Sequence, residues 1–311
     1  MAKKRSKAVD YGVYLAVRAL IGVLQAIPAQ VAFSFARVLA ALVHAVDKRH
    51  RMVADENLRH AFPEKDEAWR KALIRRTYDH FLLMVVEMLM LPRKYNAGNI
   101  GRYVVHAVPE MFGVTDALYR SGKPAIMVVG HFGNWEVMSY TLGLAGYRGA
   151  AIARPLDNPY LDDFLKRFRV RTGQRIIDKK DYAGIQRCMA ACEGLGIVGD
   201  QDAGARGLFV PFFNRPASTF KSVALLALEH DAPILVFGAA RAGKPLHYRL
   251  HVPDIIYPAD YAHQPDAARA ITLRFTQALE SLIRMHPEQY FWLHRRWKHQ
   301  PPVRRSKLRA A

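Results

Sequence analysis

An uninterrupted apolar run at residues 125–129 predicts a buried strand, because a strand covered on both faces need not alternate apolar and polar side chains. Gly130 and Gly133 follow the run and permit a sharp turn. Asn134 is suited to cap the helix that begins next. The pattern therefore places residues 131–136 at the carboxyl end of a strand.

Apolar runs and helical periodicity alternate over the rest of the chain. The expected strands cover residues 103–106, 125–129, 149–153, 174–177, 196–199, 234–239 and 246–251. The expected helices between them cover residues 110–120, 135–144, 159–172, 182–193, 220–230 and 266–285. This order predicts an α/β fold with a mostly parallel central sheet and helices on both faces.

The N-terminal part carries helical patterns only. The expected helices cover residues 10–27, 29–46, 51–61 and 66–91, with Pro92 ending the last. The first two have broad apolar faces, but charged residues interrupt them, so neither is a clean membrane span of ~20 apolar residues. A basic cluster at residues 3–7 favours membrane insertion or interfacial docking, and packing onto the domain is the alternative.

The net charge of +19 favours a polyanionic partner: nucleic acid, an anionic membrane, a phosphorylated lipid or an acidic carrier protein. Residues 287–298 interleave aromatic and cationic side chains, which suits either base stacking or the lipid–water interface. The 51% hydrophobic content is that of a globular chain. Cys188 and Cys192 have no metal-site or disulfide spacing, and we expect both to be buried and reduced.

His131 and Glu136 combine a base with a carboxylate. They meet only if His131 lies in the turn and Glu136 in the first helical turn, because residues five apart on one helix point roughly 140° from each other. A neutral imidazole accepts a proton from a hydroxyl, and a carboxylate on its other nitrogen orients it. No serine or cysteine adjoins His131, so we expect the substrate to supply the nucleophile. The alternative is a turn histidine and a glutamate that stabilises the helix N-terminus.

Other polar residues follow expected strands. Arg154 is placed to meet an anionic group or an oxyanion, or is a surface charge. Asp200 and Asp202 make a poor metal site without a third ligand. We expect them to organise the cleft, by accepting a hydrogen bond from His131 or by pairing with Arg154 or Arg206. The aromatic residues of the following segment line an acyl groove or fill the core: Phe209, Phe212 and Phe213.

Four blocks carry a family resemblance, namely HFGNWE at 131–136 and the segments at 153–173, 200–219 and 287–298. In this order and separation they resemble the bacterial lipid A biosynthesis late acyltransferases, the lauroyl and myristoyl transferase family. HFGNWE falls within that family's HX4(D/E) pattern, with Glu as the acid. The resemblance covers about residues 10–300. Together with the helical and charge patterns it divides the chain into membrane-associated helices at 1–46, an acyltransferase α/β domain at 47–298 and a basic C-terminal tail at 299–311.

The resemblance implies direct transfer of a fatty acyl chain from an acyl carrier protein thioester to a hydroxyl of a phosphorylated lipid A precursor. The resemblance also implies that the reaction takes place at the cytoplasmic face of the bacterial inner membrane, and we expect no cofactor or metal. His131 is the implied general base and Glu136 its orienting partner. The implied substrate-binding or oxyanion residues are Asn134, Arg154, Asp200, Asp202 and Arg206. The alternatives are another membrane acceptor, such as a glycerolipid or mannosylated lipid, and a basic nucleic-acid-binding protein.

Overall fold

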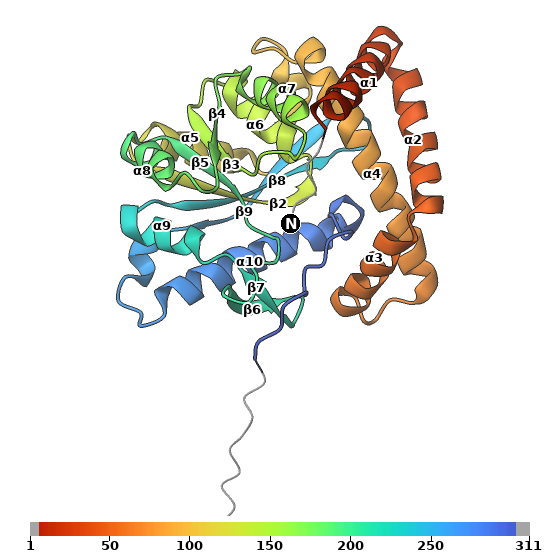
Figure 1. The fold of residues 1–311 in the computed structure, drawn as a ribbon. Helices are drawn as coiled ribbons and strands as arrows, with labels where there is room; N and C mark the ends of the chain where they lie inside the picture. Colours follow the sequence, from red (N-terminus) through yellow and green to blue (C-terminus); the bar gives the residue numbers. More distant parts are fainter. Residues whose placement is uncertain (1–5, 303–311) are drawn as a thin grey trace, which may run out of the picture.

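A computed structural model describes residues 6–302, and a central sheet organises the second part of this range (Figure 1). Within the described residues the sheet has seven strands in the order β1-β9-β8-β2-β5-β3-β4. The strands are β1 (Val104–His106), β2 (Ala125–Gly133), β3 (Gly149–Ala153), β4 (Arg175–Asp178), β5 (Gly194–Val198), β8 (Ile234–Arg241) and β9 (Tyr248–Ile256). All neighbours pair in parallel except β8 and β9, which are antiparallel. The predicted mostly parallel α/β fold is confirmed.

Strand β2 is buried because helices cover both faces of the sheet. Ile126 and Val128 belong to one apolar cluster together with Phe275 of α10. Met127 belongs to a second cluster together with Val137 of α6. The helices of this part are α5 (Pro109–Arg120), α6 (Trp135–Leu144), α7 (Pro159–Val170), α8 (Tyr182–Ala190), α9 (Ser222–His230) and α10 (Ala267–Met285). Two apolar layers around β2 explain why its sequence does not alternate.

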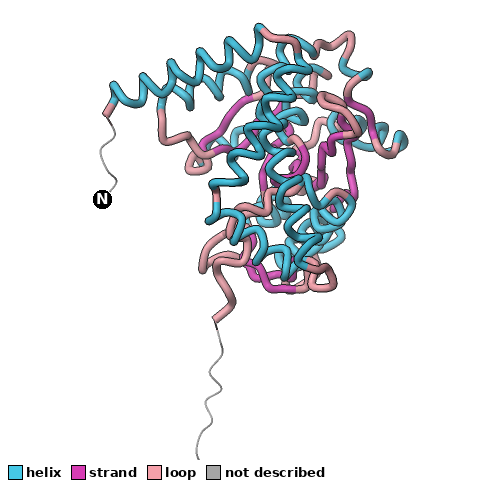
Figure 2. Tube along the Cα trace, turned by 90° about the vertical axis from the view of Figure 1, so that its right-hand side faces the viewer, coloured by secondary structure: helices cyan, strands magenta, loops and turns pink. Residues whose placement is uncertain are grey.

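The N-terminal helices lie together at one side of the sheet (Figure 1), and their buried residues join both apolar clusters of the sheet. They are α1 (Lys7–Ala26), α2 (Ala29–Val46), α3 (Lys48–Ala61) and α4 (Glu67–Lys94). Small buried residues, Ala32, Ala36 and Ala40, line the inner side of α2, which packs against α4. Figure 2 shows the start of α1 projecting beyond the body of the fold. By length and composition α1 and α2 are each able to cross a membrane, and only 17% of the most apolar stretch of each helix is buried.

Several sequence predictions are corrected. Pro92 lies inside α4 and does not end it, because a proline in the last turn removes only one helical hydrogen bond. A hairpin of β6 (Leu208–Phe212) and β7 (Arg215–Thr219) stands where no strand was expected. Cys188 is buried as expected, whereas Cys192 is exposed, and both are free thiols. Most of the predicted basic tail, residues 303–311, lies outside the described residues.

Candidate active site

Strand β2 continues past the predicted end at residue 129 to Gly133, so His131 lies on its irregular last part and not in a turn after the strand. This part with Asn134, residues 130–134, is called the catalytic turn below, and it depends on two glycines. The register between β2 and β8 shifts between Val129 and Gly133, and Gly133 has a φ of 59°. A Cβ at Gly133 would lie 1.9 Å from the carbonyl oxygen of Ala239, so this position accepts only glycine. A Cβ at Gly130 would lie 3.3 Å from Asp200 Oδ2. The bare backbone of Gly130 thus lets the Asp200 carboxylate approach the start of the turn.

Asp200 is the carboxylate that contacts His131. It follows β5, the parallel neighbour of β2, so the carboxyl ends of the two strands lie side by side. The His131 Nδ1–H donates to Asp200 Oδ1 at 2.8 Å, and the His131 backbone N–H donates to Oδ2 at 2.7 Å. The Asp200 side chain is fully buried, and that of His131 is 20% exposed. Nδ1 is therefore committed to Asp200, and within the described part of the chain no hydrogen bond engages Nε2.

Electrostatics favour a basic imidazole and an ionised carboxylate. Burial alone would lower the pKa of His131, but the charge and hydrogen bond of Asp200, with a contribution from Glu136, raise it above the ordinary imidazole value. Burial alone would raise the pKa of Asp200, but His131 holds that pKa well below its usual range. The pair therefore resembles the base and orienter of a general-base catalyst.

Glu136 does not contact the imidazole, which corrects its predicted role as the orienting partner. Its carboxylate faces α7, where Arg169 Nη2 donates to Oε1 at 2.6 Å and Nε donates to Oε2 at 3.1 Å. The Glu136 side chain is 8% exposed and that of Arg169 is 21% exposed. Sequence reasoning missed Arg169, although it lies within the 153–173 block. Nothing in that block distinguishes it from its basic neighbours.

Asn134 caps α6, as predicted. Its Oδ1 accepts from the Val137 N–H at 3.1 Å, and its Nδ2 donates to Tyr248 Oη at 3.0 Å. The residue is fully buried. Both ends of the amide are used inside the protein, which corrects its expected substrate contact.

Arg154, Asp202 and Arg206 do not contact His131. The Arg154 side chain is 70% exposed at the end of β3 and pairs with the equally exposed Asp157. Asp202 turns toward the C-terminal segment, where its Oδ2 lies 2.7 Å from His299 Nδ1. Arg206 is exposed in the loop before β6. Of the predicted acidic pair, only Asp200 joins the histidine.

The predicted acyl groove is largely core. Phe212 and Phe213 are 1% and 2% exposed and pack edge to face against each other. Trp292 packs against Phe213, and Trp297 against Phe212. Only Phe209, on the same hairpin, is half-buried. The alternative that these side chains fill the core is therefore correct for Phe212 and Phe213.

The C-terminal segment, residues 286–300, packs against the catalytic turn, a contact that the sequence did not predict. The Phe291 N–H donates to the carbonyl of His131 at 3.0 Å. The His294 ring centroid lies 6.4 Å from that of His131. Arg296 is buried and donates to the Ser218 carbonyl at 2.6 Å. Because Tyr290, Trp292 and Trp297 are buried as well, these aromatic side chains offer no platform for nucleic-acid bases or lipid headgroups.

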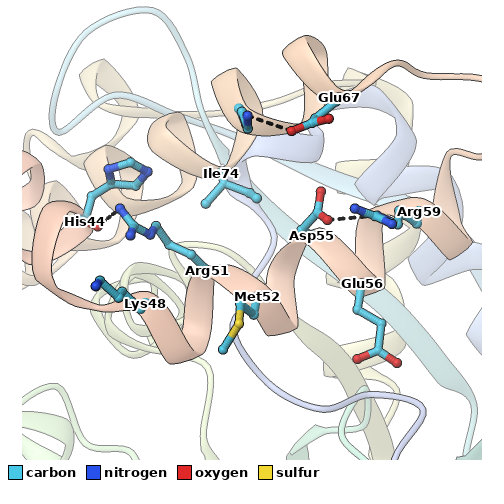
Figure 3. A pocket seen from close by; sticks show the side chains of 10 residues that line it. His44, Lys48, Arg51, Met52, Asp55, Glu56, Arg59, Glu67 and Ile74 are labelled. Atoms are coloured by element: carbon cyan, nitrogen blue, oxygen red, sulfur yellow. Dashed lines mark hydrogen bonds and ion pairs between the residues drawn. The ribbon is translucent and has the colours of Figure 1, made fainter.

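A pocket of about 640 Å³ lies elsewhere, on α2, α3 and α4 (Figure 3). Its lining is His44, Lys48, Arg51, Met52, Asp55, Glu56, Arg59, Glu67, Lys71 and Ile74. Two of its carboxylates are engaged, Asp55 with Arg59 at 2.8 Å and Glu67 with Lys71 at 2.6 Å. The pocket shares no residue with the His131–Asp200 pair. Among residues 6–302 no group of three or more His, Cys, Asp or Glu side chains is arranged to hold a metal.

The chain is similar to several known proteins. The sequence model of the family described as bacterial lipid A biosynthesis acyltransferase matches residues 1–299. The chain is 28% identical to a lipid A biosynthesis lauroyltransferase of Escherichia coli, over 82% of this chain and 81% of the relative. It is 27% identical to a lipid A biosynthesis acyltransferase of Haemophilus influenzae, over 85% and 82%. It is also 27% identical to a lipid A biosynthesis palmitoleoyltransferase of Escherichia coli, over 85% and 83%.

Proposed function

Since the chain belongs to the bacterial lipid A biosynthesis acyltransferase family, we propose that it moves a fatty acyl chain from an acyl carrier protein thioester to a hydroxyl of a lipid A precursor. The observation that carries the proposal is the hydrogen-bonded His131–Asp200 pair at the carboxyl edge of the sheet. The family consists of acyltransferases of the bacterial inner membrane. The donor, the acceptor hydroxyl and the residue roles are the parts that we propose.

The acceptor hydroxyl is the nucleophile. His131 Nε2 takes the hydroxyl proton while the oxygen attacks the thioester carbonyl, and the oxyanion of a tetrahedral intermediate forms. Collapse of this intermediate breaks the carbon–sulfur bond, and the imidazolium gives its proton to the leaving thiolate. Asp200 keeps the Nδ1–H in place and stabilises the imidazolium between the two proton transfers.

Charge and surface suit the proposed partners. The net charge of +19 favours an acidic carrier protein and a phosphorylated acceptor. The exposed guanidinium of Arg154, beyond the end of β3, is proposed to contact a phosphate of the acceptor. An exposed apolar stripe of α2 is proposed to enter the inner membrane with the active site on the cytoplasmic side; its residues are Val31, Phe35, Val38, Leu42 and Val46. Relatives that transfer lauroyl and palmitoleoyl groups leave the acyl length open.

Purified full-length protein in detergent micelles tests the proposal. The assay offers acyl carrier protein thioesters of several lengths, or the matching coenzyme A thioesters, to a lipid A precursor or to a lysoglycerolipid. Mass spectrometry then measures the acceptor. We expect an added acyl group on the lipid A precursor with the carrier-protein donor. Acylation of the glycerolipid alone would contradict the proposed acceptor, and efficient use of coenzyme A alone would contradict the proposed donor.

A further inference from the structure

A buried polar network on α4 reaches the backbone of the catalytic turn. Its members are His80 and Glu87 of α4, Arg241 of β8 and Tyr248 of β9, and none of them was singled out from the sequence. The His80 and Glu87 residues are 3% and 0% exposed. The His80 ring lies 3.1 Å from the carbonyl oxygen of Gly133, two residues beyond His131.

The hydrogen bonds fix the tautomer of His80. Arg241 Nη1 lies 2.7 Å from His80 Nδ1, and an arginine only donates, so Nδ1 is the acceptor. The proton therefore resides on Nε2, which donates to the Gly133 carbonyl. Burial, with the nearby Arg241 charge, lowers the pKa of His80 well below its ordinary value, so the ring stays neutral. His80 is thus a fixed donor aimed at the turn.

Arg241 is itself held from several sides. Its Nε donates to Glu87 Oε1 at 2.9 Å and its Nη2 donates to Oε2 at 2.5 Å. The backbone N–H of Arg241 donates to Gln289 Oε1 at 2.7 Å, which ties the network to the C-terminal segment. Tyr248 Oη donates to Glu87 at 2.5 Å and accepts from Asn134 Nδ2 at 3.0 Å. A fully satisfied buried network of this kind has little freedom to shift.

Two members of the network, together with β8, bond the polar groups of Gly133 and Asn134. His80 donates to the Gly133 carbonyl, and Tyr248 accepts a hydrogen bond from the Asn134 side chain. The Asn134 backbone N–H donates to the Ala239 carbonyl of β8 at 2.9 Å. Gly133 has no side chain and can adopt many backbone conformations, so contacts with other elements select the one observed, with its φ of 59°. We propose that His80, held by Arg241 and Glu87, is a positioning residue that fixes the Gly133 peptide and thereby holds the His131 ring against Asp200. This inference rests on the proposed role of His131.

Two amide substitutions separate the bonds of His80. In His80→Gln the amide reaches the place of Nε2 and keeps the donor to Gly133. In His80→Asn the shorter amide reaches only the place of Nδ1 and keeps the contact with Arg241. Thr77→Val is the matched control, because Thr77 is also fully buried on α4 but, among residues 6–302, its hydroxyl bonds only to the Leu73 carbonyl of its own helix at 3.0 Å.

The test uses full-length protein in micelles and two readouts: acyl-transfer kinetics and the pKa of the His131 ring by NMR, with thermal melting as the control for folding. His80→Asn should lower kcat about 10–100-fold with little change in KM, because a small misplacement of a catalytic group costs that much. It should also lower the pKa of His131, because the contact with Asp200 loosens. His80→Gln should keep kcat and the His131 pKa close to their wild-type values. Thr77→Val should change neither kcat nor the His131 pKa.

The two readouts separate the two proposals. A folded His80→Asn variant with an unchanged His131 pKa would overturn the positioning role, whatever its turnover. Equal losses in the Gln and Asn variants would also overturn it, since they indicate a merely structural histidine. If wild-type protein transfers no acyl group but the His131 pKa follows the expected order, the proposed function fails and the positioning role stands.

Discussion

His131 and Asp200 lie at the ends of neighbouring strands, and their contact defines the chemistry at the scale of single residues. The 2.8 Å hydrogen bond occupies Nδ1, and partial exposure leaves Nε2 available to a substrate. Asp200 is fully buried, and it stays ionised because it accepts two hydrogen bonds from His131. The carboxylate is therefore matched to a histidine that becomes cationic during the reaction.

The pH dependence of activity follows from this pair. His131 must be neutral to accept a proton, and its pKa lies above the ordinary value of 6.5. We therefore expect kcat/KM to rise with pH along a limb centred above 6.5. Asp200→Asn removes the negative charge, so the limb should move to lower pH while kcat falls about 10²–10⁴-fold. Initial rates across pH, corrected for spontaneous thioester hydrolysis, measure both effects. A limb that does not move in the folded variant would contradict the pairing.

The sequence indicated His131 but preferred the wrong orienting partner: Glu136 was chosen, and a hydrogen bond from His131 to the Asp200/Asp202 pair was only one of the alternatives. The order of residues in HFGNWE brings Glu136 close along the chain, and its acidity made it the natural choice for an orienter. Asp200 lies in a separate block and reaches His131 only because β5 pairs with β2. Strand order is a property of the whole sheet, so a local pattern cannot choose between the two carboxylates.

At the scale of elements, the Glu136–Arg169 ion pair joins the start of α6 to α7. It lies next to the catalytic turn and is mostly buried. Helix α6 follows β2 directly, so the ion pair also limits the movement of α6 relative to the catalytic turn. This contact gives Glu136 a role that does not require it to touch the imidazole.

Glu136→Gln should destabilise the protein, because Arg169 then stays partly buried without a counter-charge. We expect a loss of about 3 kcal/mol in the free energy of unfolding, the lower end of the range for broken buried pairs, since Arg169 is partly exposed. The double variant Glu136→Gln/Arg169→Gln should recover part of this loss. Urea unfolding in micelles measures it. Strictly additive losses in the double variant would show that the two side chains do not interact.

Elements with strong local patterns were predictable. Strand β3 and helix α6 have the predicted bounds, because an apolar run and an Asn cap mark them in the sequence. The β6–β7 hairpin was not predictable, because Phe213 and Asn214 adopt positive φ values of 48° and 58° at its turn, where glycine is the usual signal. The C-terminal segment was misjudged because alternating aromatic and cationic residues suit a surface as well as a core. The aromatic side chains of this segment are buried because it packs against the carboxyl edge of the sheet, and that packing cannot be seen in the local sequence.

At the scale of the whole molecule, α2 has two apolar sides. Small alanines on the inner side pack on α4. Larger residues face outward and are exposed, namely Val31, Phe35, Val38, Leu42 and Val46. Deleting residues 1–46 would therefore uncover α4 as well as remove the outer stripe. Substitutions on the outer side are the cleaner test of membrane docking.

Replacing Phe35, Val38 and Leu42 together with serine should reduce flotation with anionic vesicles and leave the melting temperature nearly unchanged. The reason is that these side chains, 44%, 60% and 60% exposed, contribute to lipid contact and little to the core. The matched control places serine at the exposed apolar residues Phe112 and Val114 of α5. Equal flotation of wild type and the α2 variant would contradict docking through this stripe.

The central claim is that His131 draws the proton from a lipid-borne hydroxyl. The most direct test compares wild type with His131→Ala in the micellar assay, after melting curves have shown that both are folded. Mass spectrometry of the lipid A precursor should reveal an added acyl group with wild type and a rate at least about 10²-fold lower with the variant. A folded His131→Ala protein that acylates the precursor at the wild-type rate would contradict the account.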